Sequence, residues 1–162
     1  AYGGGADGQW TVREGQYYAA CTDPPRTIHA DYSPGQVLSG VTRQVGDNPN
    51  LWASDPDEPL PQWIELRWEQ PVAIGTVELT FDTDLNTRRR PSPTAPECVR
   101  DYELSCLIDG QWRTVAEVEG NFRRKRVHRF SAVTTRTLRL TVHATNGAPS
   151  ARVFEVRAYG PG

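Results

Sequence analysis

Side chains of four types recur in the turn-rich segments of this sequence: aspartate, asparagine, arginine and histidine. Planar or forked polar groups of this kind make several hydrogen bonds at once, which suits a ligand that carries a ring of hydroxyl groups. They gather after Phe81, in the turn at residues 120–124 and after Val142, and the loop before Trp52 is expected at the same end. The candidate ligand-binding residues are Asp84, Asn86, Arg88, Asn121, Arg124, His143 and Asn146.

Each of these residues also has a purely structural interpretation. Asp84 and Asn86 are of types that stabilise turns through hydrogen bonds from side chain to backbone. His143 fits an ordinary solvent-facing strand position. The basic runs at residues 88–90 and 123–126 are, in most proteins, solvated surface. If the runs converge, they favour an anionic ligand, because a guanidinium group pairs with a carboxylate through two parallel hydrogen bonds.

Catalytic signatures are absent from the sequence. It has no glycine-rich phosphate loop, no HExxH motif and no GxSxG motif. The three histidines, His29, His128 and His143, are scattered and have no nucleophile or metal-ligand cluster beside them in the sequence. We therefore expect a protein that binds its ligand without catalysing a reaction.

The elements that must position the loops are short β-strands, and the clearest one lies at residues 61–68. Its apolar residues, Ile64, Leu66 and Trp68, alternate with charged ones. This period of two predicts a strand with one face on a core and the other in water.

Similar alternation recurs along the rest of the chain. Asp109-Gly110 predicts a two-residue hairpin turn, because both positions of such a turn favour residues that tolerate a positive φ. About eight short strands separated by turns predict an antiparallel sandwich, in which two sheets bury their apolar faces against each other. The further expected strands lie around residues 10–12, 16–20, 77–81, 102–106, 112–118, 127–130, 138–142 and 154–158.

The composition fits such a fold and disfavours other classes. The chain has 162 residues, enough for one domain with a sizeable core, and its 14 glycines and 13 prolines disfavour long helices. A net charge of -2 gives no general attraction to nucleic acid or to an anionic membrane. No apolar run approaches the roughly 20 residues of a transmembrane helix. We expect residues 1–9 to be a flexible leader or linker and residues 10–162 to form a single sandwich domain.

The three cysteines are too few for a disulfide framework and lack the paired spacing of a zinc site. Cys106 shares the alternation of Tyr102 and Leu104, so we expect it to be a buried free thiol. A disulfide between Cys21 and Cys98 is the open alternative for an exported protein.

Several segments, in this order and spacing, resemble the discoidin, or coagulation factor 5/8 type C, superfamily. They are Trp52-Ala53-Ser54 before Gln62-Trp63-Ile64-Glu65-Leu66, then Asp101-Tyr102-Glu103-Leu104-Ser105 with Asp109-Gly110-Gln111-Trp112, and the ending Val153-Phe154-Glu155-Val156-Arg157-Ala158-Tyr159-Gly160. The resemblance covers about residues 35–160. It implies an all-β, galactose-binding-like jelly-roll sandwich whose loops at one end bind sugars, other glycans or, in some branches, phospholipid and protein.

The resemblance also implies roles for particular residues. Trp52, Trp63 and Trp112 occupy positions of framework aromatic residues, so we expect them to pack in the core. Similar modules often hold a structural calcium ion; Glu155 matches their acidic ligand in the final strand, and Asp47 is the candidate in the upstream loop. That loop lacks the usual Asp-Gly pair, and calcium takes about six to eight oxygen ligands. No cofactor is required, and the sequence leaves open whether calcium binds.

The leading hypothesis is a non-catalytic carbohydrate-binding module, an accessory domain of a larger exported carbohydrate-active enzyme in the extracellular space or periplasm. Its partners would be a glycan or polysaccharide, acidic if the arginine runs take part, and the covalently linked catalytic domain. The alternative is a structural or protein-interaction appendage without a ligand of its own, which an exposed apolar patch at Trp10, Tyr17 or Tyr18 would favour. Nucleic acid and membranes are not expected partners.

Overall fold

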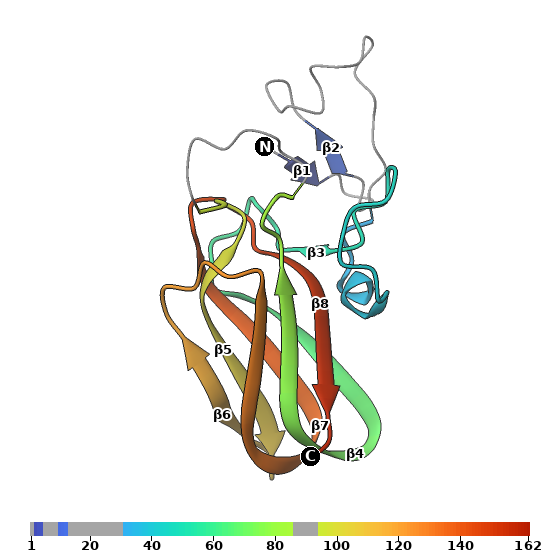
Figure 1. Ribbon diagram of the computed structural model, residues 1–162, viewed down its shortest axis with the longest axis vertical. Helices are drawn as coiled ribbons and strands as arrows, with labels where there is room; N and C mark the ends of the chain where they lie inside the picture. Colours follow the sequence, from blue (N-terminus) through green and yellow to red (C-terminus); the bar gives the residue numbers. More distant parts are fainter. Residues whose placement is uncertain (1, 5–9, 13–30, 86–93) are drawn as a thin grey trace.

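The computed structural model describes residues 2–4, 10–12, 31–85 and 94–162, and its regular structure is nearly all antiparallel β. A 3₁₀ helix, η2 (Pro34–Leu38), lies beside the last strand (Figure 1). Two short strands, β1 (Tyr2–Gly4) and β2 (Trp10–Val12), pair with each other. The main sheet contains β3 (Trp52–Ala53), β4 (Gln62–Phe81), β5 (Val99–Ile108), β6 (Gln111–Val118), β7 (Lys125–Thr145) and β8 (Arg152–Tyr159).

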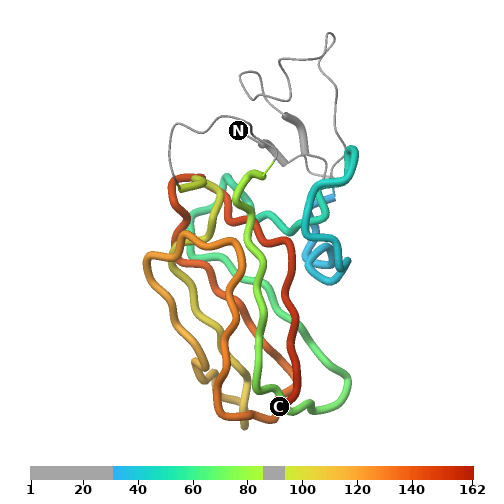
Figure 2. Tube along the Cα trace, viewed as in Figure 1, coloured from blue at the N-terminus to red at the C-terminus, as the bar shows by residue number. Residues whose placement is uncertain are grey.

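The main sheet is folded over into two layers. Its strand order is β3-β8-β4-β7-β5-β6, and all neighbouring strands are antiparallel. β4 and β7 are 20 and 21 residues long, and each bends back on itself at the end of the molecule where the C-terminus lies (Figures 1 and 2). Layer A therefore contains β3, β8, residues 72–81 of β4 and residues 125–130 of β7. Layer B contains residues 62–67 of β4, residues 137–145 of β7, β5 and β6.

The fold class is confirmed as an antiparallel β-sandwich of the jelly-roll type, but the expected number of about eight strands is wrong. The sheet has six, because β4 and β7 each join two segments that the sequence predicted as separate strands. Their pairing shifts register twice, the second time between Ile74 and Thr76 of β4. In β4, the core residues have even numbers up to Ile74 and odd numbers from Val77 onward. The irregular pairing between these two segments therefore exchanges the residues that face the core with those that face outward, within one strand.

The hairpin prediction at Asp109-Gly110 is confirmed. The two residues have φ angles of 50° and 76° and join β5 to β6, with Ile108 opposite Gln111. Two successive residues with positive φ match the twist of the adjoining strands. The turn lies at the same end of the molecule as the bends of β4 and β7 (Figure 1).

The core lies between the layers and is built from alternate residues of every long strand. Each fully buried aliphatic or aromatic side chain contributes about 1.5–3 kcal/mol. Tyr102 of layer B contacts layer A directly: its ring centroid lies 5.1 Å from that of Phe81, in an edge-to-face contact. The largest fully buried side chains are Tyr102, Phe81, Ile74, Leu79, Leu104, Leu138, Leu140, Val77, Val99, Val142, Val153 and Val156.

The described cysteines both lie inside the protein. Cys106 is a buried free thiol, as predicted, and burial raises its pKa to about 11. Cys98 is buried as well, but Cys21 lies outside the described residues, so a disulfide between them stays a prediction. Within the described ranges, no helix is long and apolar enough to cross a membrane.

His128 makes folding stability sensitive to mild acid. Its Nε2 lies 2.9 Å from the Tyr102 hydroxyl, and burial, aided by the charge of Arg126, lowers its pKa below the ordinary 6.5. As the pH falls, His128 is therefore protonated in the unfolded chain at a higher pH than in the folded protein. We expect the free energy of unfolding to be undiminished above pH 6.5 and to fall as the pH drops below it.

Chemical denaturation between about pH 7.5 and pH 5 measures this slope. His128→Gln should flatten it, because it removes the buried titrating group. The carboxylates with lowered pKa, such as Asp101 and Glu65, lose their contribution only near and below their ordinary values of 3.8 and 4.5, outside this window. An equal slope in His128→Gln and the wild type would contradict the assignment.

Candidate functional site

Segments that are distant in the sequence meet at the end of the sandwich opposite the bends of β4 and β7. The backbone N–H of Asn121 donates to Arg100 O at 2.8 Å, that of Asn146 to Cys98 O at 3.0 Å, and that of Phe81 to Arg124 O at 2.7 Å. We call the surface formed by residues 81–85, 94–98, 119–124 and 145–151 the loop end. The predicted site residues that are described lie on it or, for His143, beside it.

Asn121 is the internal brace of the loop end. It is only 2% exposed, and its Nδ2 donates to Val99 O at 2.7 Å and to Arg123 O at 3.2 Å. Its Oδ1 accepts from the Arg123 backbone N–H at 3.1 Å and from Arg126 Nη1 at 3.3 Å. The polar atoms of this side chain are thus committed to the protein, which gives Asn121 a structural role.

Asn146 links two of the converging loops. Its Nδ2 donates to Cys98 O at 3.0 Å and to Asn121 O at 2.9 Å. Because both donors of the amide are used, only its carbonyl oxygen is left for a ligand.

Arg124 is also turned towards the protein. It donates from Nη1 to Phe81 O at 3.1 Å and from Nη2 to Thr42 O, and its guanidinium carbon lies 4.9 Å from the centroid of the Phe154 ring. A cation that carries donors in a plane can hold several carbonyl oxygens at once. Arg124 therefore ties the segment before β3 and the end of β4 to the start of β7.

Asp84 lies in a tight turn at the end of β4. Its φ is 47°, and its backbone N–H donates to Asp82 Oδ1 at 2.7 Å, so the neighbouring carboxylate supports the left-handed conformation. The Asp84 side chain is half-buried at the loop end. Asn86 and Arg88, the other residues predicted in this loop, lie outside the described residues.

His143 is exposed on the outer face of β7, as its alternation with Val142 predicted. It lies near Asp101, whose pKa is lowered first by its hydrogen bond from Arg100, then by the Gly120 N–H, and to a smaller extent by the charge of His143. The Gly120 N–H donates to Asp101 Oδ1 at 2.8 Å. Asp101 thus connects the surroundings of His143 to the turn at residues 119–124.

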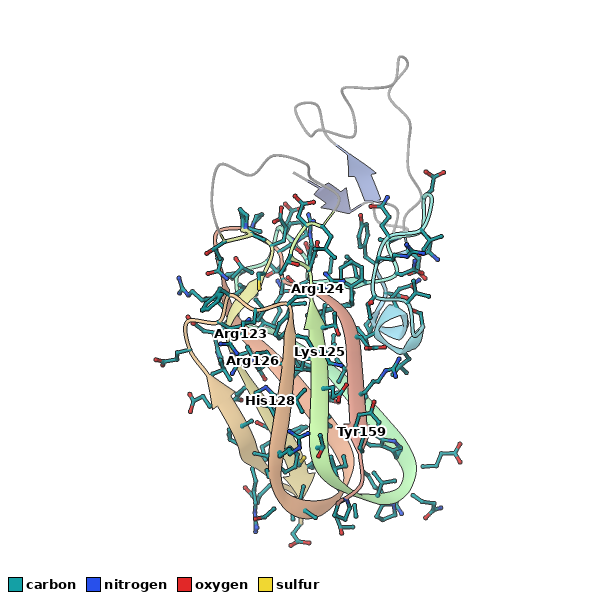
Figure 3. All side chains as sticks on the ribbon, viewed as in Figure 1. Arg123, Arg124, Lys125, Arg126, His128 and Tyr159 are labelled. Atoms are coloured by element: carbon teal, nitrogen blue, oxygen red, sulfur yellow. The ribbon has the colours of Figure 1, made fainter. Side chains whose placement is uncertain are left out.

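The basic run at residues 123–126 does not form one charged patch, because strand alternation divides it. The exposed Arg123 and Lys125 alternate with the half-buried Arg124 and Arg126, and Figure 3 labels all four near the start of β7. Lys125 pairs with Glu78 at 2.9 Å, whereas Arg123 is exposed. Of the four basic residues, Arg123 offers the most accessible charge at the loop end.

Phe122 is the feature of the loop end that sequence reasoning did not assign to a sugar site. Its side chain is 63% exposed beside Arg123, whose guanidinium carbon lies 5.9 Å from the ring centroid. An aromatic residue between Gly120-Asn121 and a basic run, outside any alternating segment, was the available signal. An exposed ring with a nearby cation provides a flat surface and a hydrogen-bond donor together.

The expectation that all three tryptophans pack in the core is wrong for two of them. Trp52 is buried, but Trp63 is 50% and Trp112 is 40% exposed. The alternation in β4 explains the result for Trp63, which shares the outward parity of Glu65 and not that of the buried Ile64. Both exposed tryptophans lie on the outer face of layer B.

The two candidate calcium ligands lie in different surroundings. Glu155 is 6% exposed and its Oε1 accepts from Arg157 Nε at 2.7 Å, with Arg157 Nη2 at 2.6 Å. Asp47 is exposed in the turn closed by the Val45–Asn48 bridge. In the described part of the chain, no group of three or more histidine, cysteine, aspartate or glutamate side chains is placed to hold a metal ion. Because calcium also binds backbone carbonyl oxygens, a structural calcium ion stays a prediction.

The fold and the loop end define a binding domain of the β-sandwich class, and comparison with known proteins identifies its family. A family model described as the F5/8 type C domain matches residues 27–156. The chain therefore belongs to the F5/8 type C domain family, as its sequence resemblance indicated, and it is a non-catalytic type of module. No curated protein sequence matches it significantly.

Solved structures share the fold at low sequence identity. The family 32 carbohydrate-binding module of Streptococcus pneumoniae EndoD is 19% identical with a TM-score of 0.65, over 80% of this chain and 86% of that one. A Clostridium perfringens module, CpGH89CBM32-5 in complex with GalNAc-β-1,3-galactose, is 18% identical with a TM-score of 0.57, over 76% and 81%. Chitosan-binding module 2 from Paenibacillus sp. IK-5, in complex with chitotriose, is 16% identical with a TM-score of 0.62, over 80% and 87%.

Asn121→Ala should lower the free energy of unfolding by about 1–3 kcal/mol, because it leaves buried backbone groups without their partners. The adjacent exposed residue provides the control: Arg123→Ala should change stability by less than about 0.5 kcal/mol. Urea denaturation of both variants measures the difference. Equal effects would show that Asn121 does not brace the loop end.

A chelator should not change the melting temperature. Arg157 already supplies the positive charge that pairs with Glu155, and a ligand of the native state would raise its apparent stability. Melting curves in EDTA and in millimolar calcium chloride test this. A midpoint that rises with calcium would contradict the expectation and show an ion site that the acidic side chains alone do not define.

Proposed function

We propose that this domain is a carbohydrate-binding module that holds a glycan at its loop end. The observation that best supports the proposal is Phe122, a largely exposed ring on a loop that buried hydrogen bonds hold in place. The family membership and the sugar complexes of two structural neighbours support the same ligand class.

The proposed site combines an apolar plane with polar groups around it. A pyranose ring has one face of C–H groups that can lie on the Phe122 ring, while its hydroxyls need donors and acceptors at the rim. Arg123 and His143 would supply donors, and Asp84 an acceptor; the carbonyl oxygen of Asn146 is a further acceptor. Affinity for one sugar should be modest, because exposed polar groups exchange one set of hydrogen bonds for another.

One exposed cation at the loop end supports binding of glycans that contain uronate or sulfate. The guanidinium carbon of Arg123 lies 5.9 Å from the centroid of the Phe122 ring, and the Arg123 side chain is exposed. A carboxylate on the ligand would pair with the guanidinium group of Arg123 through two parallel hydrogen bonds.

We infer that the domain is an accessory part of a larger exported carbohydrate-active enzyme, in the extracellular space or periplasm. The Paenibacillus module to which it is similar is derived from a chitosanase/glucanase. The alternative is an interaction appendage, which an exposed apolar patch at Trp10, Tyr17 or Tyr18 would favour; the side chains of these residues lie outside the part of the chain that the structure describes. The proposed role is to keep a linked catalytic domain close to its glycan.

Phe122→Ala should weaken glycan binding roughly threefold to tenfold, because it removes the stacking surface and leaves the buried braces intact. His143→Ala should weaken binding to the same glycan, and Arg123→Ala should weaken binding to acidic glycans more than to neutral ones. A glycan array identifies the ligand, and calorimetry with that ligand measures the variants.

Tyr159→Ala is a control outside the loop end, since Tyr159 is an exposed aromatic residue at the end of β8. It should bind as the wild type does. Unchanged affinity in Phe122→Ala and His143→Ala would rule out the proposed location, and a failure of the wild type to bind any glycan would rule out the function.

A further inference from the structure

The outer face of layer B carries a cluster that the loop-end site does not use, formed by Trp63, Glu65, Trp112 and Arg139. The guanidinium carbon of Arg139 lies 4.5 Å from the centroid of the Trp63 ring and 3.9 Å from that of Trp112. Both distances fall within the range of cation–π contact. We call this cluster the aromatic clamp.

The strand register explains why the clamp forms from residues so far apart in sequence. Glu65 of β4 is paired with Arg139 of β7, and Arg139 with Ser105 of β5. These three paired residues, Glu65, Arg139 and Ser105, form one row across the layer. Trp63 lies two residues before Glu65 on β4, and Trp112 of β6 pairs with Leu107, two residues after Ser105 on β5. The two tryptophans therefore stand on either side of Arg139 and lean over it from opposite edges of the four-stranded layer.

Ion pairs beneath the rings hold the clamp in place. Glu65 is nearly buried, and it accepts from Arg139 Nε at 2.9 Å and from Arg67 Nε at 2.8 Å. Burial alone would raise the pKa of Glu65, but hydrogen bonds and charge from these two arginines lower it, so the carboxylate is ionised. A guanidinium group fixed by its Nε and Nη2 orders the rings against it, which reduces the entropy lost when a ligand binds.

The surroundings of the clamp indicate the chemistry of its ligand. About half of Trp63 and 40% of Trp112 are exposed, although each ring has Arg139 against it. Leu107 is the cross-strand partner of Trp112, and the other neighbours of the rings on this face include the polar residues Thr114, Thr141 and Glu103. A protein interface would have a larger apolar centre. Two isolated rings among hydroxyls and carboxylates suit a sugar chain, whose residues each have one apolar face and a polar rim.

Charge argues for a neutral chain. Two arginines, Arg67 and Arg139, share this face with three glutamates, Glu65, Glu103 and Glu117, so the face has no excess of positive charge. At the loop end, in contrast, the exposed guanidinium group of Arg123 lies beside Phe122. An acidic polysaccharide would therefore gain nothing from the clamp.

We propose that the aromatic clamp is a second glycan site, which binds a neutral polysaccharide chain across the outer face of layer B. This proposal rests on the proposed function only for the class of ligand, a glycan, because none of the clamp residues belongs to the loop end. With two rings and a flat strand surface, it is suited to consecutive sugar units, whereas Phe122 offers a single ring.

Affinity gel electrophoresis with galactan, galactomannan, xyloglucan and mixed-linkage β-glucan, together with alginate as the acidic probe, tests the proposal. Trp63→Ala and Trp112→Ala should each weaken binding to at least one neutral polysaccharide by roughly threefold to tenfold. Trp63→Phe and Trp112→Phe should retain most of it. The same polysaccharide should protect tryptophan emission from acrylamide quenching in the wild type, and not in the double alanine variant.

Tyr159→Ala is the matched control, because Tyr159 is an exposed aromatic residue on β8 in layer A. It should bind all the probes as the wild type does. Phe122→Ala separates the two sites: binding lost in Phe122→Ala but retained in the tryptophan variants would uphold the loop end and overturn the clamp. Self-association that Trp63→Ala abolishes, without any polysaccharide protecting the tryptophans, would also overturn it, in favour of a protein interface.

Discussion

Two strands that belong to both layers are the constraint on which this structure depends. Because β4 and β7 pair with each other along nearly their whole length, the position of one layer fixes that of the other. The pairing places Gln62 beside Val142 and Thr80 beside Lys125, so both ends of each strand come to the same end of the molecule. The loop end exists because these strands bend and return.

The loop end shows how a site can be built from polar side chains of which only some are free to bind. Asn121 and Arg124 have the types that a hydroxyl-rich ligand needs, yet their hydrogen bonds hold the loops together. Phe122 and Arg123, which lie between them in the chain, face solvent. A buried amide must find partners inside the protein, so Asn121 holds the turn in place while the two residues that follow it stay exposed.

Along the strands, residues point alternately inward and outward, and this gives the sandwich surfaces that differ in charge and in aromatic content. On β7, Arg126 and His128 face inward, and Lys125 faces outward to Glu78. On the other layer, outward parity brings Trp63 and Arg139 together from adjacent strands. The loop end therefore exposes an arginine beside a single aromatic ring, whereas the outer face of layer B carries two aromatic rings and no excess of positive charge.

Sequence alone determined the fold class, the Asp109-Gly110 turn, the buried thiol of Cys106 and the outward position of His143, because each depends on the local period of two or on the φ preference of a few residues. The continuity of β4 and β7 was not predictable. At residues 74–77 the core positions change from even to odd numbers, and the sequence pattern is the same whether two strands are joined by a turn or one strand bends. Only the tertiary structure decided that Asn121 is a brace, that Arg123 is the accessible arginine of its run, and that Trp63 and Trp112 enclose Arg139. These outcomes depend on which strands become neighbours and on their register, and long-range pairing of that kind leaves no local mark in the sequence.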